Sequence, residues 1–564
     1  MLHENPKSVQ RSEAYLHFII CLYILVISQF LVIQRSRQVM YIKDEKPKKI
    51  DRKKAEDAAG TTVFKRKKIG ADIALYAAWS LFVLIVSGCN YALMNPVRIV
   101  ILIAGFAGLS YLILKGEDKD KKGRMLAVIT IVAIAIRTFY VIYTGAEQRQ
   151  HDMGEFDVDL GLNYHGEYIE YLLENHKLLN ENIMEHWQFY HPPLQHILSA
   201  VFFGIYRAIV PSFAHNWDAI QTLSLFYSLV TLAVMRGFTD LWEMSPEAKS
   251  VSYLTVALHP QLIVFAGAIN NDPLSVMFVI AALYLTCIWY QGETHDLFSE
   301  NSVFPRLSLI KKAETKQFVL LIGMALCIGL GMMAKLSAGM IAFPIGFLML
   351  KVFFKSSRKA RTAAEYLAFI VICAPLGLWY QIRSYILWKV PLTYVAVPDT
   401  EINPGLVINA PAWGRFLGFG DGVDYNIITE TLDAAVFDGD YYRDHVKLAL
   451  VGYFLLIAFG LFTVTLLANF IVAWVKERNL MNLVMTILLV TQLASYVYFC
   501  FSYPYTCTMS FRYIVPTIVA AAYYTGRSKD ISPHMLWLVT KISVYAVAVT
   551  SLTFYCLVWT KDLA

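Results

Sequence analysis

Residues 447–475 read KLALVGYFLLIAFGLFTVTLLANFIVAWV, and after Lys447 this stretch contains no charged side chain. An α-helix needs about 20 consecutive apolar residues to cross the roughly 30 Å hydrocarbon core of a bilayer. The stretch therefore predicts a membrane-spanning helix. Comparable apolar runs recur along the chain, so the spanning helix is the expected unit of the fold.

The composition agrees with this interpretation, because 57% of the 564 residues are apolar and only 16% are charged. Soluble proteins average about 45–50% apolar and about 25% charged residues. A soluble enzyme, a nucleic-acid-binding module and a disordered scaffold are thereby excluded, and we expect an all-α polytopic membrane protein without a nucleic-acid partner. The expected spans number about 14, near residues 14–34, 71–90, 97–114, 125–144, 218–236, 250–268, 273–291, 317–334, 338–354, 363–381, 447–475, 483–502, 511–526 and 535–558.

The distribution of Lys and Arg predicts the orientation. Segment 35–70 contains three clusters of Lys and Arg, and such loops stay on the cytoplasmic side. We interpret it as a topogenic segment rather than an RNA site. The two longest loops then lie outside, at 145–217 and 382–446, provided that the apolar stretch 193–210 does not cross the membrane. We expect this stretch to lie along the outer interface or to dip into the membrane and return.

The first outer loop begins with a dense polar segment that includes His151, Asp152 and Glu155. Four carboxylates fall within the eight residues from Asp152 to Asp159. Such a group at a lipid–water boundary supplies a general base or holds a divalent cation, Mg²⁺ or Mn²⁺. An ordinary solvated loop start explains it equally well. The same loop also contains the polar and aromatic candidates His165, Tyr190 and His191.

A second acidic turn, Asn270-Asn271-Asp272-Pro273, connects two predicted spans. Asn, Asp and Pro are frequent in tight turns for geometric reasons alone. The predicted topology, however, places this turn on the same side as Asp152. We therefore expect the two loops to converge on one outer pocket.

Three cationic residues at predicted outer span ends are candidates for binding an anion. They are Lys335, Arg383 and Arg512. Any one of them alone can simply extend its charged group to the membrane interface, as most Lys and Arg side chains at span ends do. Three of them on the side of both acidic loops favour a bound phosphate or pyrophosphate.

Taken in order, these motifs resemble the GT-C superfamily of polyprenyl-phosphate-dependent glycosyltransferases. The nearer branch contains family 39, with protein O-mannosyltransferases, lipid A aminoarabinose transferases and RgtA/B/C/D-like bacterial relatives. The resemblance covers about residues 125–526. It rests on His151-Asp152 through Glu155, Tyr190-His191-Pro192-Pro193-Leu194, Asn271-Asp272-Pro273, Lys335 to Ser337, Pro375 to Arg383 and Phe511 to Tyr513.

The resemblance implies a GT-C-type helix bundle with juxtamembrane helices in the first outer loop. The implied activity moves a sugar, of hexosyl or mannosyl type, with inversion from a polyprenyl-phosphate donor to an extracytoplasmic protein, glycolipid or cell-wall polymer. The implied site faces the extracytoplasmic side of the cell membrane. Its catalytic residues are Asp152, Glu155 and Asp272, and its substrate-binding residues are His151, His165, Tyr190, His191, Asn271, Lys335, Arg383 and Arg512.

The implied organisation is a transmembrane extension over 1–124, a catalytic core over 125–526 and a final transmembrane helix over 527–564. A polyprenyl-lipid flippase or secondary transporter is the alternative, because it also has many spans and buried charges. Transporters often show internal repeats and polar sites near the midplane. This sequence shows no convincing repeat, and its polar clusters lie at span ends. A non-catalytic scaffold would not need carboxylates and cations on one face.

Overall fold

The structure is a computed structural model that describes residues 53–117, 121–146, 155–157, 161–213, 215–298, 307–397, 426–437 and 446–558. The chain divides into two compact units, residues 1–68 and 69–564. All contacts described below lie within the larger unit.

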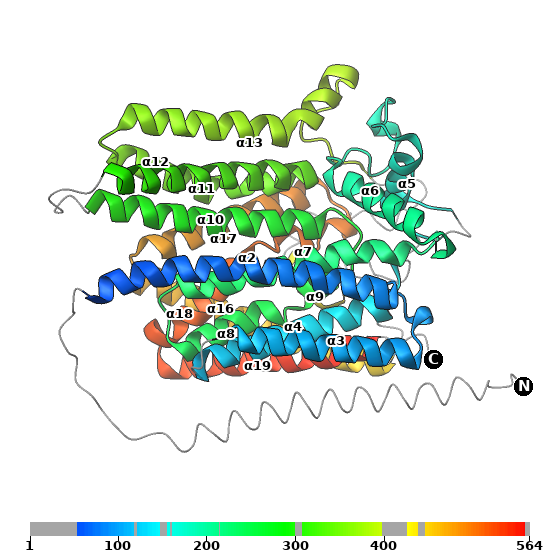
Figure 1. Cartoon of the computed structure of the whole chain (residues 1–564), viewed down its shortest axis with the longest axis horizontal. Helices are drawn as coiled ribbons and strands as arrows, with labels where there is room; N and C mark the ends of the chain where they lie inside the picture. Colours follow the sequence, from blue (N-terminus) through cyan, green and yellow to red (C-terminus); the bar gives the residue numbers. More distant parts are fainter. Residues whose placement is uncertain are drawn as a thin grey trace, which may run out of the picture. The chain divides into compact units, whose positions relative to one another are not determined.

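The larger unit is built from long helices packed side by side, as α10, α11, α12 and α13 show most clearly (Figure 1). The long helices are α2 (Lys53–Ser87), α3 (Pro96–Lys115), α4 (Lys121–Tyr143), α7 (Gln221–Leu241), α10 (Asp272–Phe298), α11 (Leu307–Ala334), α12 (Ala342–Lys355), α13 (Lys359–Trp388), α16 (Val446–Lys476), α17 (Leu480–Ser502) and α19 (His534–Leu557). The shorter ones are α5 (Tyr164–Asn175), α6 (Leu194–Ile209), α8 (Pro246–Ala257), α9 (Pro260–Val264), α15 (Ile427–Phe437) and α18 (Thr517–Ile531).

Eleven helices in the described part of the chain are long and apolar enough to cross a membrane. They coincide with eleven of the predicted spans and confirm an all-α polytopic architecture. The predicted span at 14–34 lies outside the described residues. The two remaining predictions, at 250–268 and 511–526, are wrong as continuous helices.

The expected span at 250–268 is divided into α8 and α9. Proline lacks an amide hydrogen and disfavours a helical conformation in the residue before it, and His259, just before Pro260, is extended. The break leaves carbonyl groups without helical partners. Arg137 of α4, fully buried, donates to the carbonyl oxygen of Ala257 at 2.6 Å and to Ser228 Oγ at 2.9 Å. A buried guanidinium thus satisfies the end of α8.

The expected span at 511–526 is also divided. Phe511–Ile514 forms a single 3₁₀ turn, and α18 begins only after Pro516, which occupies its N-cap. Proline is tolerated at a helix start but not in its interior, where it removes a hydrogen bond and clashes with the preceding turn. Arg512 therefore lies in a turn instead of in a spanning helix.

The stretch 193–210 forms α6, whose 16 residues are too few for a spanning helix, whereas the 14 residues of α12 continue directly from the 3₁₀ helix Leu336–Ile341 to give the 20-residue span Leu336–Lys355. Its buried residues include the polar Gln195, His196 and Ser199. Its exposed residues are apolar, among them Val201 and Ile209. The stretch therefore does not form a continuous helix of spanning length, and its position relative to the membrane interface stays a prediction.

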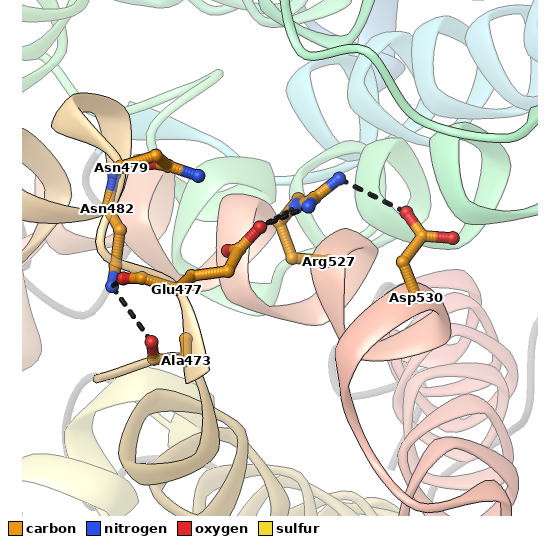
Figure 2. Close-up of polar contacts among 6 residues, drawn as sticks. All are labelled: Ala473, Glu477, Asn479, Asn482, Arg527 and Asp530. Carbon is orange, nitrogen blue, oxygen red and sulfur yellow. Dashed lines mark hydrogen bonds and ion pairs between the residues drawn. The ribbon is translucent and has the colours of Figure 1, made fainter. Parts of the chain in front are cut away.

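At one end of the bundle, side chains from separate helices form ion pairs, and we call this the ion-pair end. Arg527 of α18 donates through Nε to Glu477 Oε1 at 3.0 Å and through Nη1 to Asp530 at 3.1 Å (Figure 2). Asn482 fixes the same turn by donating to the carbonyl oxygens of Ala473 and Glu477. The turn between α16 and α17 is thereby joined to α18.

Other helices are joined at the same end. Glu247 at the start of α8 accepts hydrogen bonds from Lys529 of α18 at 2.5 Å and from Lys541 of α19 at 3.2 Å. Arg236 of α7 pairs with Glu117, which follows α3. These ion pairs lie at or beside segments 115–124, 476–478 and 527–529, which are rich in Lys and Arg and are therefore expected inside.

We expect Arg527→Met to lower the free energy of unfolding by about 3 kcal/mol, because it leaves the largely buried Glu477 carboxylate without its partner. Arg361→Met is the matched control, since Arg361 pairs with Glu365 on the surface of a single helix. That change is expected to cost less than about 0.5 kcal/mol. Thermal unfolding in detergent measures both, and equal losses would show that the Arg527 pair does not hold the helices together.

Candidate functional site

The opposite end of the bundle, which we call the loop end, contains a buried ion pair. Asp272 occupies the first turn of α10, where the helix dipole favours a carboxylate. Its backbone N–H donates to Asn270 Oδ1 at 3.0 Å. Lys335 lies in the extended residue between α11 and the 3₁₀ helix η6 (Leu336–Ile341), and its Nζ pairs with Asp272 Oδ1. The two helix ends thus meet through opposite charges 63 residues apart in the sequence.

Arg512 and Tyr513 lie beside this ion pair, in the 3₁₀ helix η10 (Phe511–Ile514). Lys335 Nζ lies 4.7 Å from the centre of the Tyr513 ring, and the Arg512 guanidinium lies 4.9 Å from it. Arg512 Nη2 also donates to the Tyr513 hydroxyl at 3.0 Å. One aromatic ring therefore lies close to both cations.

The break between α8 and α9 helps to position this turn. The ring of His259, in the break, stacks on Phe511 with 5.1 Å between ring centres. Phe511 immediately precedes Arg512, so the two broken helices are in contact next to the cation. The position of Arg512 depends on both breaks.

A small pocket that is partly open to the outside lies between these groups. One acidic and two basic side chains line it, which leaves one formal positive charge. Apolar side chains from α10 and the start of α18 complete its wall. The polar lining residues are Asp272, Ser275, Lys335, Ser337, Gln492, Arg512 and Tyr513, and the apolar ones are Val276, Val279, Ala338 and Pro516.

The first outer loop folds into α5 and α6 around a group of buried polar residues. Glu155 is buried and accepts a hydrogen bond from the backbone N–H of His165 at 3.2 Å. His165 Nδ1 lies 2.8 Å from His196 Nε2. A Cβ on Gly166 would lie 2.2 Å from the carbonyl oxygen of Glu155, so glycine is required for this close approach. Glu155 thus serves at least to fix the start of α5.

Tyr190 and His191 extend this group toward the pocket. The ring of His191 stacks on His165 with 5.8 Å between centres. Burial lowers the pKa of His191 well below its ordinary value of 6.5, and the positive charges of Lys335 and Arg512 act in the same direction. His191 is therefore neutral at neutral pH and adds a hydrogen-bonding group, not a charge, beside the cations.

Of the described binding residues that the sequence predicted, only Lys335 and Arg512 line the pocket, and Arg383 and Asn271, like His165, Tyr190 and His191, are not part of the lining. Arg383 donates through Nη2 to the carbonyl oxygen of Leu179 at 2.8 Å, and its guanidinium lies 4.9 Å from the Trp388 ring centre. It holds the loop after α5 against α13. Asn271 is buried next to Asp272, and its side-chain amide nitrogen has no hydrogen-bond partner.

Two further predicted site residues, His151 and Asp152, lie outside the described residues. The described neighbours are Ala146 on one side and Glu155 on the other. Within the described part of the chain, no three His, Cys, Asp or Glu side chains form a metal-binding group.

Sequence reasoning did not single out Gln492 and His196. Gln492 lies in α17 and lines the pocket. The sequence feature that could have identified it is an amide side chain within an otherwise apolar span. His196 follows the Pro-Pro-Leu element on a short helix. The sequence feature that could have identified it is its position on the same polar face as Gln195 and Ser199.

No protein-family model matches the chain, and no curated protein matches it significantly. The chain is similar to the apo form of the Archaeoglobus fulgidus oligosaccharyltransferase, with a TM-score of 0.43 and 11% identity over 78% of this chain and 56% of that chain. It is also similar to AglB from the same organism in complex with an inhibitory peptide and a dolichol-phosphate, with a TM-score of 0.43 and 11% identity over 77% and 56%. The chain spans little more than half the length of these structures.

The low pKa of His191 predicts a pH dependence of stability. Below about pH 6.5 the unfolded chain binds a proton at this imidazole that the folded chain does not bind. Its contribution to stability is therefore present above about pH 6.5 and is lost as the pH falls. We expect His191→Gln to reduce the loss of stability between pH 7.5 and 5.5 by about 1 kcal/mol. The control His215→Gln, at an exposed position, should leave the loss unchanged in thermal unfolding, and an equal effect of both would refute the assignment.

Proposed function

We propose that the protein is an integral-membrane glycosyltransferase of GT-C type. It moves a sugar with inversion from a polyprenyl-phosphate-linked donor to an acceptor outside the cytoplasm. The observation that carries the proposal is the pocket at the loop end, in which Asp272, Lys335 and Arg512 come together from three separate segments.

The pocket is suited to a phosphorylated lipid. Lys335, paired with Asp272, and Arg512 both line the pocket, so two cationic side chains are close enough to contact a phosphate there. Guanidinium groups bind phosphate through charge-assisted hydrogen bonds. The adjoining apolar wall and the surrounding bilayer accommodate a hydrocarbon chain. As the phosphate leaves the sugar, these cations stabilise the charge that develops on it.

The acceptor side of the site is the first outer loop. In the proposed reaction Asp152 takes the proton of an acceptor hydroxyl while its oxygen attacks the anomeric carbon. Glu155 and Asp272 are the other catalytic residues and support Asp152. The substrate-binding residues are His151, His165, Tyr190, His191 and Asn271. Arg383 acts through the loop that it holds. A divalent cation, Mg²⁺ or Mn²⁺, would bind to the acidic segment that begins at Asp152 and would offset the charge of the leaving phosphate.

The proposed location is the cell membrane, with the active site facing outward, because the Lys- and Arg-rich loops lie at the ion-pair end, opposite the pocket. In this proposal the core over 125–526 carries the site, and the extension over 1–124 and the final helix over 527–564 are additions to that core. The proposed sugar is a hexose, such as mannose, and the proposed acceptor is a protein, glycolipid or cell-wall polymer.

A flippase or secondary transporter is the alternative function. Such proteins rock one group of helices against another to open the site to each side in turn. Here Glu247 joins α8 to α18 and α19, and Arg527 joins α18 to the turn between α16 and α17. These ion pairs oppose separation of the helices at the ion-pair end. An enzyme that works from one side needs no such separation.

We expect Asp152→Asn to lower the turnover number by about 10²–10⁴-fold, because it removes the proposed general base. The assay follows transfer of labelled sugar from a polyprenyl-phosphate donor by the full chain reconstituted in liposomes. The control Glu174→Gln removes an exposed carboxylate of the same loop and should leave turnover unchanged. Wild-type turnover in the Asp152 variant would exclude this residue as the base.

Arg512→Met is expected to lower kcat/KM for the donor about 10- to 100-fold, since a charge-assisted hydrogen bond contributes about 1.5–3 kcal/mol. Arg512→Lys should recover part of this loss because it retains the charge. Lys177→Met, at an exposed position of the first outer loop, serves as the control for a general loss of positive charge. If Arg512→Met bound and used the donor like wild type, the pocket would not be the phosphate site.

A further inference from the structure

The turn between α2 and α3 has an unusual backbone conformation. Gly88 and Cys89 both have positive φ, at 59° and 57°. The side chain of Asn90 uses both of its polar atoms. Its Oδ1 accepts from the backbone N–H of Ala92 at 2.8 Å, which caps the short helix η1 (Tyr91–Leu93), and its Nδ2 donates to Asp218 Oδ2 at 2.6 Å.

Asp218 connects this turn to two other segments. Its Oδ1 accepts from the backbone N–H of Ala146 at 2.7 Å and from Gln221 Nε2 at 3.2 Å. Ala146 follows α4 at the start of the first outer loop, and Gln221 is the first residue of α7. A single carboxylate therefore joins the extension, the first outer loop and the core.

Two further contacts hold the turn in place. Asn216 Nδ2 donates to the carbonyl oxygen of Gly88 at 2.9 Å and to the Tyr206 hydroxyl of α6 at 3.2 Å. Cys89 Sγ lies 3.2 Å from Thr222 Oγ1. A Cβ on Gly88 would lie 2.9 Å from Asn216 Nδ2, so a side chain at this position would displace the contact.

These contacts act on the segment that contains the proposed general base. Ala146 precedes Asp152 by six residues, and Glu155 follows it by three. Glu155 is itself held by the backbone N–H groups of Asn163 and His165. The described residues on either side of Asp152, namely Ala146 and Glu155, are therefore both held by hydrogen bonds, and Ala146 is held by its bond to Asp218.

We propose that the α2–α3 turn is a positioning element for the acidic segment, in which Asn90 orients Asp218 and Asp218 fixes the backbone of Ala146. The catalytic part of this inference rests on the proposed function. It assigns a role to part of the extension that a minimal catalytic core would lack. Asn90 touches no donor or acceptor and acts only through Asp218.

Two variants test the contact between Asn90 and Asp218. Asn90→Asp keeps the oxygen that caps η1 but places a carboxylate against the Asp218 carboxylate. The double variant Asn90→Asp/Asp218→Asn exchanges the two groups, so that an amide at 218 again accepts from Ala146 and donates to position 90. Asn95→Ala is the matched control, because Asn95 caps α3 at Arg98 in the same turn and its contact does not involve Asp218.

Hydrogen exchange of the full chain in detergent tests the positioning directly and without any assay of transfer. We expect Asn90→Asp to increase the exchange rate of the Ala146 amide at least about tenfold. The double variant should return this rate to the wild-type value. Asn95→Ala should match wild type. If Asn90→Asp left exchange at Ala146 unchanged, or if the double variant exchanged as fast as the single one, the proposed connection would be refuted.

The transfer assay then tests the effect on catalysis. Asn90→Asp is expected to lower kcat about tenfold with little change in the donor KM, since the turn does not line the donor pocket. The double variant should recover most of this loss. Altered exchange with unchanged kcat would overturn the catalytic role. Absence of transfer by wild type with every donor would contradict the proposed function, while the exchange experiment would still decide the connection.

Discussion

The loop end of this protein depends on the pairing of Asp272 with Lys335 in an apolar bundle. An isolated charge removed from water costs several kcal/mol, and a partner of opposite charge offsets that cost. Both side chains are largely buried, so neither is stable there without the other. The pair therefore keeps the start of α10 beside the end of α11. Arg512 lines the same pocket beside this pair.

Breaks in the helices create the positions from which the site is built. Pro260 and Pro516 interrupt segments that are apolar enough to continue, and each break needs replacement hydrogen bonds or packing. Arg137 supplies them to the end of α8, and the contact between His259 and Phe511 joins the two breaks. The same physical demand, that buried backbone groups find partners, thus places Arg512 at the pocket.

The two ends of the bundle differ in the kind of contact that joins their segments. At the ion-pair end, charged side chains such as Glu247 and Arg527 join helices directly to one another. At the loop end, an amide and a carboxylate, Asn90 and Asp218, join a turn of the extension to the first outer loop. One end is held closed, and the other carries the pocket and the loop beside it.

The sequence by itself determined the all-α architecture and eleven spans, because lipid forces each crossing segment to be a long apolar helix. It also marked Asp272, Lys335 and Arg512, since charges at span ends are rare. Tertiary structure alone decided that these three share one pocket while Arg383 holds a loop, because helix rotation and packing fix where a long side chain reaches. It also decided that Gln492 lines the pocket and that Asn90 is connected through Asp218 to Ala146 in the first outer loop. Contacts between residues so far apart in sequence leave no local pattern to read.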